Sequence, residues 1–153
     1  MVLPDYWLTR PSATDDEEAR TAFDALLDTT LGGSDCPTIR YTLPWPKWQF
    51  LCHVAEHRDI ALHGSGDSDI ALFEPRQSID LNEFGNRKAV YAAADGIWPM
   101  FFAIVDRDRV DTVSNACVRL IDESGEVYGP YYVFSVSQSA LAHRPWRTGW
   151  GYL

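Results

Sequence analysis

The order of local patterns along the chain is the strongest constraint on its fold. Thr14-Asp15-Asp16-Glu17 reads as a capping box, and the helix that it starts continues at helical spacing to Gly32-Gly33. Lys47 to His57 is a second helical segment, with Trp48, Leu51, Cys52 and Ala55 on one face. Short strand patterns follow after residue 58. Helices first and several short strands later predict an α+β domain.

The last third of the chain reads as strands joined by tight turns. Cys117–Ile121 and Val127–Val136 are predicted strands, with Asp122–Glu126 as the turn and Gly129-Pro130 as a bulge. Asp95 is the expected cap of a helix that runs to Ile104 or Val105. Three shorter elements complete the prediction: a strand at Lys88–Ala93, a helix near Ser139–His143 and a strand near Trp150–Leu153.

Length and composition describe one acidic globular domain over residues 1–153. Hydrophobic residues make up 46% of the chain, and 13 basic residues against 22 acidic ones give a net charge of −9. Nucleic-acid backbones are bound by clustered Lys and Arg, so the composition argues against a nucleic-acid partner. No apolar run is long enough to span a membrane, and the first ten residues lack the pattern of a secretory signal. We therefore expect a cytoplasmic protein without a membrane partner.

His53-Val54-Ala55-Glu56-His57 matches a short pattern found in zinc peptidases. On a helix, His53 and His57 lie one turn apart and could share a metal ion, with Glu56 as a general base. The simpler interpretation is an amphipathic helix whose polar face holds two histidines. A zinc hydrolase stays an alternative at this point.

Two further segments point to a ligand site. Ile60-Ala61-Leu62-His63 is a short predicted strand that Gly64-Ser65-Gly66 ends, which places an imidazole beside open main chain. Ala89-Val90-Tyr91-Ala92-Ala93 is a second strand, and the helix capped by Asp95 follows it directly. The main chain at Gly64 could pair with a carboxamide, because an amide needs one donor and one acceptor.

Leu62-His63-Gly64-Ser65 together with Val90-Tyr91-Ala92 resembles the ADP-ribosyltransferase fold of diphtheria-type toxins, poly(ADP-ribose) polymerases and RNA 2′-phosphotransferases. The resemblance covers residues 59–153 and implies a pair of small antiparallel sheets that form a cleft, with residues 1–58 as a helical N-terminal addition. It implies NAD as the substrate and an unknown macromolecular acceptor. In that family the histidine contacts ribose hydroxyls, the glycine binds the nicotinamide amide through its main chain, and the tyrosine stacks on the nicotinamide ring. The resemblance assigns these roles to His63, Gly64 and Tyr91, with Ser65 as a further polar contact.

Charged residues complete the expected site. Arg76 could meet the pyrophosphate of NAD, and Arg87 and Lys88 precede the second motif. The family supplies its catalytic glutamate on a late strand, but in this chain that position falls on Pro130 or Tyr131. Glu126 is the nearest acid and becomes the candidate catalytic residue.

Two readings of the resemblance remain open. The chain either transfers ADP-ribose from NAD, with Glu126 stabilising positive charge on the sugar, or it is a catalytically inactive module that binds a ligand or a protein on the same fold. The displaced acid favours the second reading.

Overall fold

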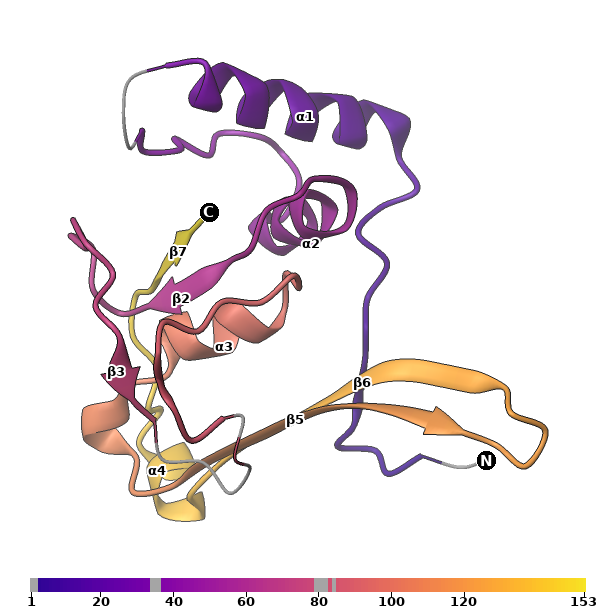
Figure 1. The fold of residues 1–153 in the computed structure, drawn as a ribbon, viewed down its shortest axis with the longest axis vertical. Helices are drawn as coiled ribbons and strands as arrows, with labels where there is room; N and C mark the ends of the chain where they lie inside the picture. Colours follow the sequence, from indigo (N-terminus) through magenta and orange to yellow (C-terminus); the bar gives the residue numbers. More distant parts are fainter. Residues whose placement is uncertain (1–2, 34–36, 79–82, 84) are drawn as a thin grey trace.

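The computed structural model describes residues 3–33, 37–78, 83 and 85–153. Figure 1 shows two helices, α1 (Glu17–Leu31) and α2 (Lys47–His57), stacked above the strands, while a long hairpin lies at the opposite end of the molecule. The chain is therefore α+β, as the order of patterns predicts. None of the helices in the described residues has the length and apolarity needed to cross a lipid bilayer.

Helices α1 and α2 share an apolar core. The Phe23 ring packs edge-on against Trp45 and Phe50, with ring centroids 5.9 and 5.8 Å apart. The predicted cap of α1 was wrong by two residues. Asp16 is the N-cap and accepts hydrogen bonds from the main-chain N–H groups of Glu18 and Ala19, while Thr14 Oγ1 accepts from the N–H of Asp16.

Helix α2 has the predicted bounds, but it buries a different face. Its buried residues are Phe50, Cys52, His53 and Val54. His53 was expected on a polar face and is instead 2% exposed. Two interactions account for this: the Phe23 ring packs beside the imidazole at 5.6 Å, and Asp24 of α1 supplies a polar partner at the helix–helix boundary.

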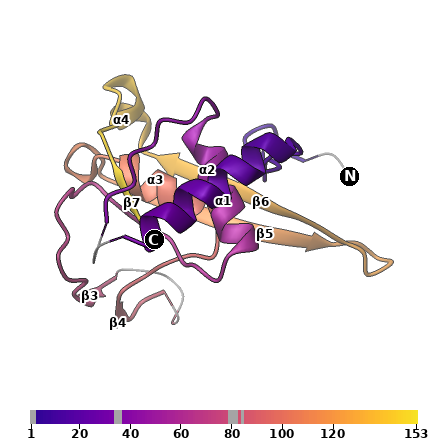
Figure 2. The ribbon, with the colours of Figure 1, turned by 90° about the horizontal axis from the view of Figure 1, so that it is seen from above.

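The largest sheet is a hairpin with one short added strand. Strand β5 (Val113–Ile121) pairs with β6 (Val127–Val136), and β1 (Leu8–Thr9) adds to the other edge of β6. The register shifts between Val118 and Leu120, opposite Gly129-Pro130, which confirms the predicted bulge. Figures 1 and 2 both show the β5–β6 turn reaching beyond the helices. Strand β1 was not predicted, because two residues carry no readable period.

Two more sheets have two strands each. β2 (His63–Ser65) pairs with β7 (Trp150–Tyr152), and β3 (Arg76–Gln77) pairs with β4 (Lys88–Ala89). The described residues thus form three small antiparallel sheets where the resemblance implies two. The predicted strands at residues 60–63 and 88–93 are shifted and shortened, and between them only Leu62 and Ala93 pair as an isolated bridge.

Helix α3 (Trp98–Ile104) lies between the β2–β7 pair and the hairpin (Figure 1). Asp95 accepts hydrogen bonds from the N–H groups of Ile97 and Trp98 and so holds the start of this helix, but the N-cap residue is Ile97, two residues after the predicted cap. The same carboxylate accepts a hydrogen bond from the hydroxyl of Tyr132, a fully buried residue of β6. A 3-10 turn (Arg107–Arg109) and helix α4 (Gln138–Ala142) complete the described elements.

Candidate functional site

His63 and Tyr91 come together at the end of strand β2. The Nδ1 atom of His63 lies 2.7 Å from the main-chain oxygen of Tyr91. A carbonyl oxygen can only accept, so Nδ1 carries the proton when the imidazole is neutral. The Nε2 atom of His63 is then left as a hydrogen-bond acceptor.

The two strands that carry this pair separate at the same place. Leu62 and Ala93 exchange both main-chain hydrogen bonds, each 2.9 Å long. Main-chain groups alternate in direction along a strand, so the N–H and C=O of Gly64 point toward the same side as those of Leu62. The Leu62–Ala93 pairing is an isolated bridge, and in the described residues the ladder does not continue to Gly64. An amide donor and acceptor therefore face the gap between the strands.

Gly64 is required here for packing as well. A methyl group at this position would overlap the main-chain oxygen of Pro99, because helix α3 lies directly against β2. Side chains alternate along a strand, so His63 and Ser65 project from the opposite face. Ser65 Oγ accepts a hydrogen bond from the N–H of Asp67 at 3.1 Å.

The face of the β2–β7 pair that points away from α3 carries aromatic side chains. His63 lies opposite Tyr152 and Ser65 lies opposite Trp150, so these four residues form the outer face of the pair. The ring of Phe73 packs against both His63 and Tyr152, with centroid distances of 4.9 and 5.5 Å. No sequence motif predicted Phe73, Trp150 or Tyr152 at the site. Alternation along the last strand could have placed Trp150 and Tyr152 together, but nothing local identifies their partner strand.

Two tyrosine hydroxyls fix the segments around this face. The hydroxyl of Tyr152 donates to the main-chain oxygen of Asp67 at 2.8 Å and accepts from the N–H of Ile70 at 3.2 Å. The hydroxyl of Tyr91 bonds to the main-chain oxygen of Gly85 at 2.6 Å and to the N–H of Arg87 at 3.2 Å. The Tyr91 ring is thus held at its far end while 36% of the residue stays exposed.

Arg147, which no sequence motif predicted at the site, brings a positive charge to the end of β2. Its guanidinium lies against Gly66, where a side chain on residue 66 would otherwise begin. Its main-chain N–H donates to the oxygen of Ile104 at 2.8 Å, which holds the residue beside the end of α3. Among the described residues, no acid forms a salt bridge with Arg147.

The basic residues expected at the site lie on one two-stranded sheet. Arg76 of β3 is opposite Ala89 of β4, and Arg87 and Lys88 adjoin it. All three basic side chains belong to exposed residues, and Arg87 lies 3.7 Å from the carboxylate of Glu83. The structure brings Arg76 and the 87–88 pair onto neighbouring strands, but Arg76 and Lys88 project from opposite faces of the sheet, because Lys88 lies opposite Gln77.

Glu126 does not join His63. It lies at the turn between β5 and β6, where its carboxylate accepts a hydrogen bond from the hydroxyl of Tyr128 at 2.8 Å. That turn is the part of the hairpin farthest from the β2–β7 pair in Figure 1. Because the hairpin projects from the body, Glu126 lies apart from His63, Gly64 and Tyr91, the residues with which it was expected to act.

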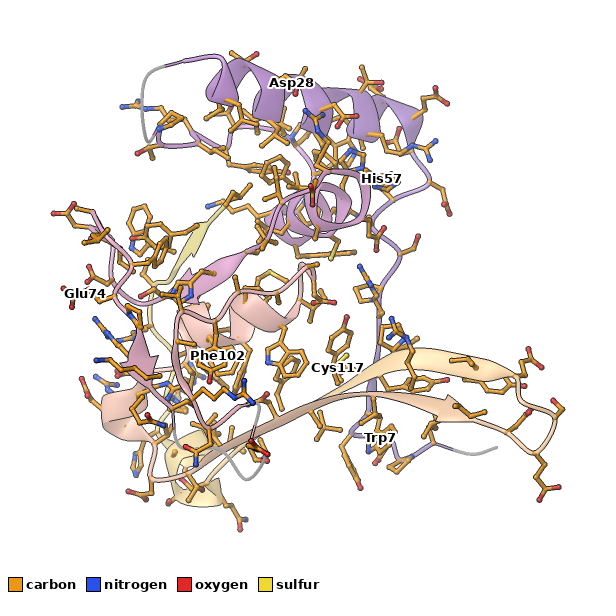
Figure 3. All side chains as sticks on the ribbon, in the orientation of Figure 1. Trp7, Asp28, His57, Glu74, Phe102 and Cys117 are labelled. Atoms are coloured by element: carbon orange, nitrogen blue, oxygen red, sulfur yellow. The ribbon has the colours of Figure 1, made fainter. Side chains whose placement is uncertain are left out.

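The His53-x-x-Glu56-His57 motif is divided among three different partners. His53 Nε2 lies 3.1 Å from Asp24, His57 Nδ1 lies 3.0 Å from the main-chain oxygen of His53, and Glu56 forms a 2.7 Å ion pair with Arg10. Figure 3 shows His57 and Asp28 in the helical layer, away from the strands. No group of three or more potential metal ligands occurs in the described part of the chain, so the geometry does not favour a zinc hydrolase.

Cysteine chemistry finds no support near this motif. Burial, followed by the negative charges of Asp95 and Glu56, raises the pKa of the Cys52 thiol to about 12. Burial also raises the pKa of Cys117, which lies on the hairpin side of the body in Figure 3. A thiol with such a pKa is protonated near neutral pH and is a poor nucleophile. Cys36 lies outside the described residues.

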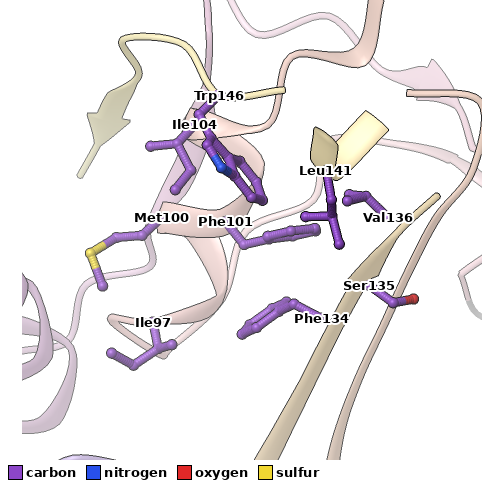
Figure 4. A pocket seen from close by; sticks show the side chains of 9 residues that line it. All are labelled: Ile97, Met100, Phe101, Ile104, Phe134, Ser135, Val136, Leu141 and Trp146. Carbon is purple, nitrogen blue, oxygen red and sulfur yellow. The ribbon is translucent and has the colours of Figure 1, made fainter. Parts of the chain in front are cut away.

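Two hollows lie elsewhere on the surface. One, of about 510 Å³, is lined by polar side chains between α1 and α2 that already bond to one another. The other, of about 430 Å³, lies between α3, β6 and α4 (Figure 4). It offers no charged side chain to orient a substrate. Its lining consists of Ile97, Met100, Phe101, Ile104, Phe134, Ser135, Val136, Leu141 and Trp146.

The comparisons with known proteins add no relative. No protein-family model, no curated protein and no solved structure matches the chain.

Proposed function

We propose that the protein binds NAD at the gap between β2 and the segment around Tyr91. The observation that carries the proposal is the separation of the two strands after the Leu62–Ala93 bridge. This separation leaves the main-chain donor and acceptor of Gly64 facing the gap, and these are the two groups that a nicotinamide carboxamide needs.

His63 and Tyr91 suit the remaining parts of the nicotinamide end. Because Nδ1 of His63 donates to the oxygen of Tyr91, its Nε2 can accept a hydrogen bond from a ribose hydroxyl. The Tyr91 ring, anchored through its hydroxyl and partly exposed, offers a flat surface for the nicotinamide ring.

Transfer of ADP-ribose to a macromolecular acceptor is the reaction proposed for this site. It breaks the bond between nicotinamide and ribose, joins the ribose carbon to a nucleophile of the acceptor, and releases nicotinamide, while the proton of the nucleophile passes to solvent. The transition state gathers positive charge on the sugar, which a carboxylate stabilises. The expected carboxylate, Glu126, lies at the hairpin turn, and this placement favours a second candidate function, binding of NAD without turnover.

Titration calorimetry with NAD tests the binding. We expect measurable binding, which His63→Ala weakens about 10-fold or more through loss of a hydrogen bond and of ring contacts. His143→Ala is the matched control, because His143 is an exposed residue at the end of α4. Absence of NAD binding at millimolar concentration, or an equal loss in both variants, contradicts the proposal.

Release of nicotinamide separates the two candidate functions. Labelled NAD incubated with the protein should yield free nicotinamide and a labelled acceptor if the protein is a transferase. Binding without any release identifies the inactive module. Glu126→Gln then decides the role of the acid, because release that continues unchanged in this variant excludes Glu126 as the catalytic residue.

A further inference from the structure

Trp150 leaves a large aromatic surface open on the outer face of the β2–β7 pair. It lies opposite Ser65 in the register, and 43% of the residue is exposed. A partly exposed indole is a common stacking surface for flat rings, because it combines a wide apolar face with a rigid side chain.

Of the two rows on this face, the row of Ser65 and Trp150 is the one that Phe73 does not cover. Along β2, Ser65 lies two residues beyond His63, or about 7 Å. The first row, His63 with Tyr152, is covered by the ring of Phe73. A ligand held at Gly64 can therefore cross the outer face only beside Ser65, and this path leads to Trp150.

A positive charge lies just beyond the end of β2. The Arg147 guanidinium packs against Gly66, the residue after Ser65, and it forms no salt bridge with an acid in the part of the chain that the structure describes. An unpaired guanidinium suits a phosphate group, which it can bind through two parallel hydrogen bonds. In a chain with a net charge of −9, such a local cation matters for an anionic ligand.

We infer that Trp150 is the specificity-determining residue of the site and stacks on the adenine of the dinucleotide, with the pyrophosphate passing Ser65 toward Arg147. This inference rests on the proposed function. It assigns the two ends of NAD to different strands: the nicotinamide to the gap beside β2 and the adenine to β7. The site therefore distinguishes NAD from nicotinamide mononucleotide, which lacks the adenosine half.

Calorimetry of both ligands with matched variants tests the assignment. Trp150→Ala should weaken NAD binding about 10- to 100-fold, the range that loss of one stacked base gives, and should leave nicotinamide mononucleotide binding unchanged. Trp150→Phe should recover most of the NAD affinity, since a smaller ring still stacks. Trp146→Ala is the control, because Trp146 is 44% exposed but lines the apolar hollow instead. The Tm of each variant reports whether it is folded.

The outcomes distinguish NAD binding itself from the placement of adenine on Trp150. If the wild-type protein binds neither ligand, the proposed function itself fails. If it binds NAD and Trp150→Ala leaves that affinity unchanged, or weakens both ligands equally, only the adenine assignment fails. Arg147→Gln gives an independent check. It should weaken NAD and nicotinamide mononucleotide together, because both carry a phosphate, and leave free nicotinamide unaffected.

Discussion

The helical layer and the outer face of the β2–β7 pair differ in how their side chains are satisfied. In the helical layer polar groups bond to one another, whereas on the outer face aromatic groups are left exposed. Between α1 and α2, Arg58 bonds to both Asp24 and Asp28, and His53 bonds to Asp24. On the outer face, Trp150 is 43% exposed and Phe73 is 39% exposed. The difference shows where binding should be sought. Groups that already have partners maintain the fold, whereas aromatic groups with open surface are available to a ligand.

The largest loss of unfolding free energy is expected for a substitution in the helical layer. Phe23→Ala removes a fully buried ring that contacts three other rings, so we expect the free energy of unfolding to fall by about 3–5 kcal/mol. Denaturant unfolding measures this. His63→Ala should lower the free energy of unfolding by less than about 1.5 kcal/mol while weakening NAD binding about 10-fold or more. If the two variants instead lose similar stability, the division between fold-maintaining and ligand-binding groups is wrong.

The next largest loss of unfolding free energy is expected where the hairpin is joined to the start of α3. Tyr132→Phe removes the hydroxyl that donates to the Asp95 carboxylate and keeps the shape of the ring, so we expect a loss of about 1.5–3 kcal/mol. Tyr128→Phe is the matched control, since its hydroxyl bonds to Asp122 and Glu126 at the exposed hairpin turn. Equal losses of unfolding free energy in the two variants would show that burial of the bond does not matter.

The Asp24 network should make the helical layer sensitive to acid. Burial raises the pKa of Asp24, but hydrogen bonds and charge from His53 and Arg58 lower it by more, so the net shift is downward. Because its pKa is lower in the folded state, the ionised Asp24 carboxylate stabilises the fold at pH values above its unfolded pKa of about 3.9. This stabilisation is lost as the pH falls through the folded-state pKa. Because these side chains are partly exposed, Asp24→Asn should cost only about 0.2–1 kcal/mol at pH 6.

This difference between Asp24→Asn and the wild type should shrink as the pH is lowered toward 3. Unfolding in denaturant across that range measures it, with Asp111→Asn, a change at an exposed residue outside the helical layer, as the reference. A difference that stays constant with pH would mean that the ionised carboxylate of Asp24 contributes nothing.

The smallest expected effect concerns zinc. Because the motif residues His53, Glu56 and His57 each have a different partner, zinc should shift the Tm of the wild type no more than that of His57→Ala. Thermal unfolding with and without the metal measures this. A stabilisation of several degrees that disappears in His57→Ala would restore the metal site as a candidate.

Local sequence signals predicted the elements better than their partners. The bounds of α2 and the β5–β6 turn with its bulge follow from spacing and turn chemistry, and both are confirmed. Strand β5 begins at Val113, four residues before its predicted start, and the N-cap of α3 is Ile97 instead of Asp95. The burial of His53 was missed, since it depends on Asp24, 29 residues away in the chain.

The candidate site shows the same limit. His63, Gly64 and Tyr91 stand in short motifs that a reader of the sequence can find. Trp150 and Arg147 join them only because β7 pairs with β2, more than 80 residues earlier, and a three-residue strand carries no signal of its partner. The displacement of Glu126 likewise follows from how far the hairpin extends, which spacing alone does not reveal.

The close seating of α3 has a consequence for how this protein can change. Gly64 and Gly149 both face that helix, where a methyl group would overlap the main chain of Pro99 or Ala103. Their neighbours Ser65 and Trp150 project from the opposite face of the pair. Gly64 and Gly149 therefore admit no larger residue, whereas Gly151, opposite Gly64 in the register, has open space where a methyl group would be added. The outer positions Ser65 and Trp150 can be replaced with little effect on the helix. A library restricted to the outer face could alter which ligand is held while the scaffold stays the same.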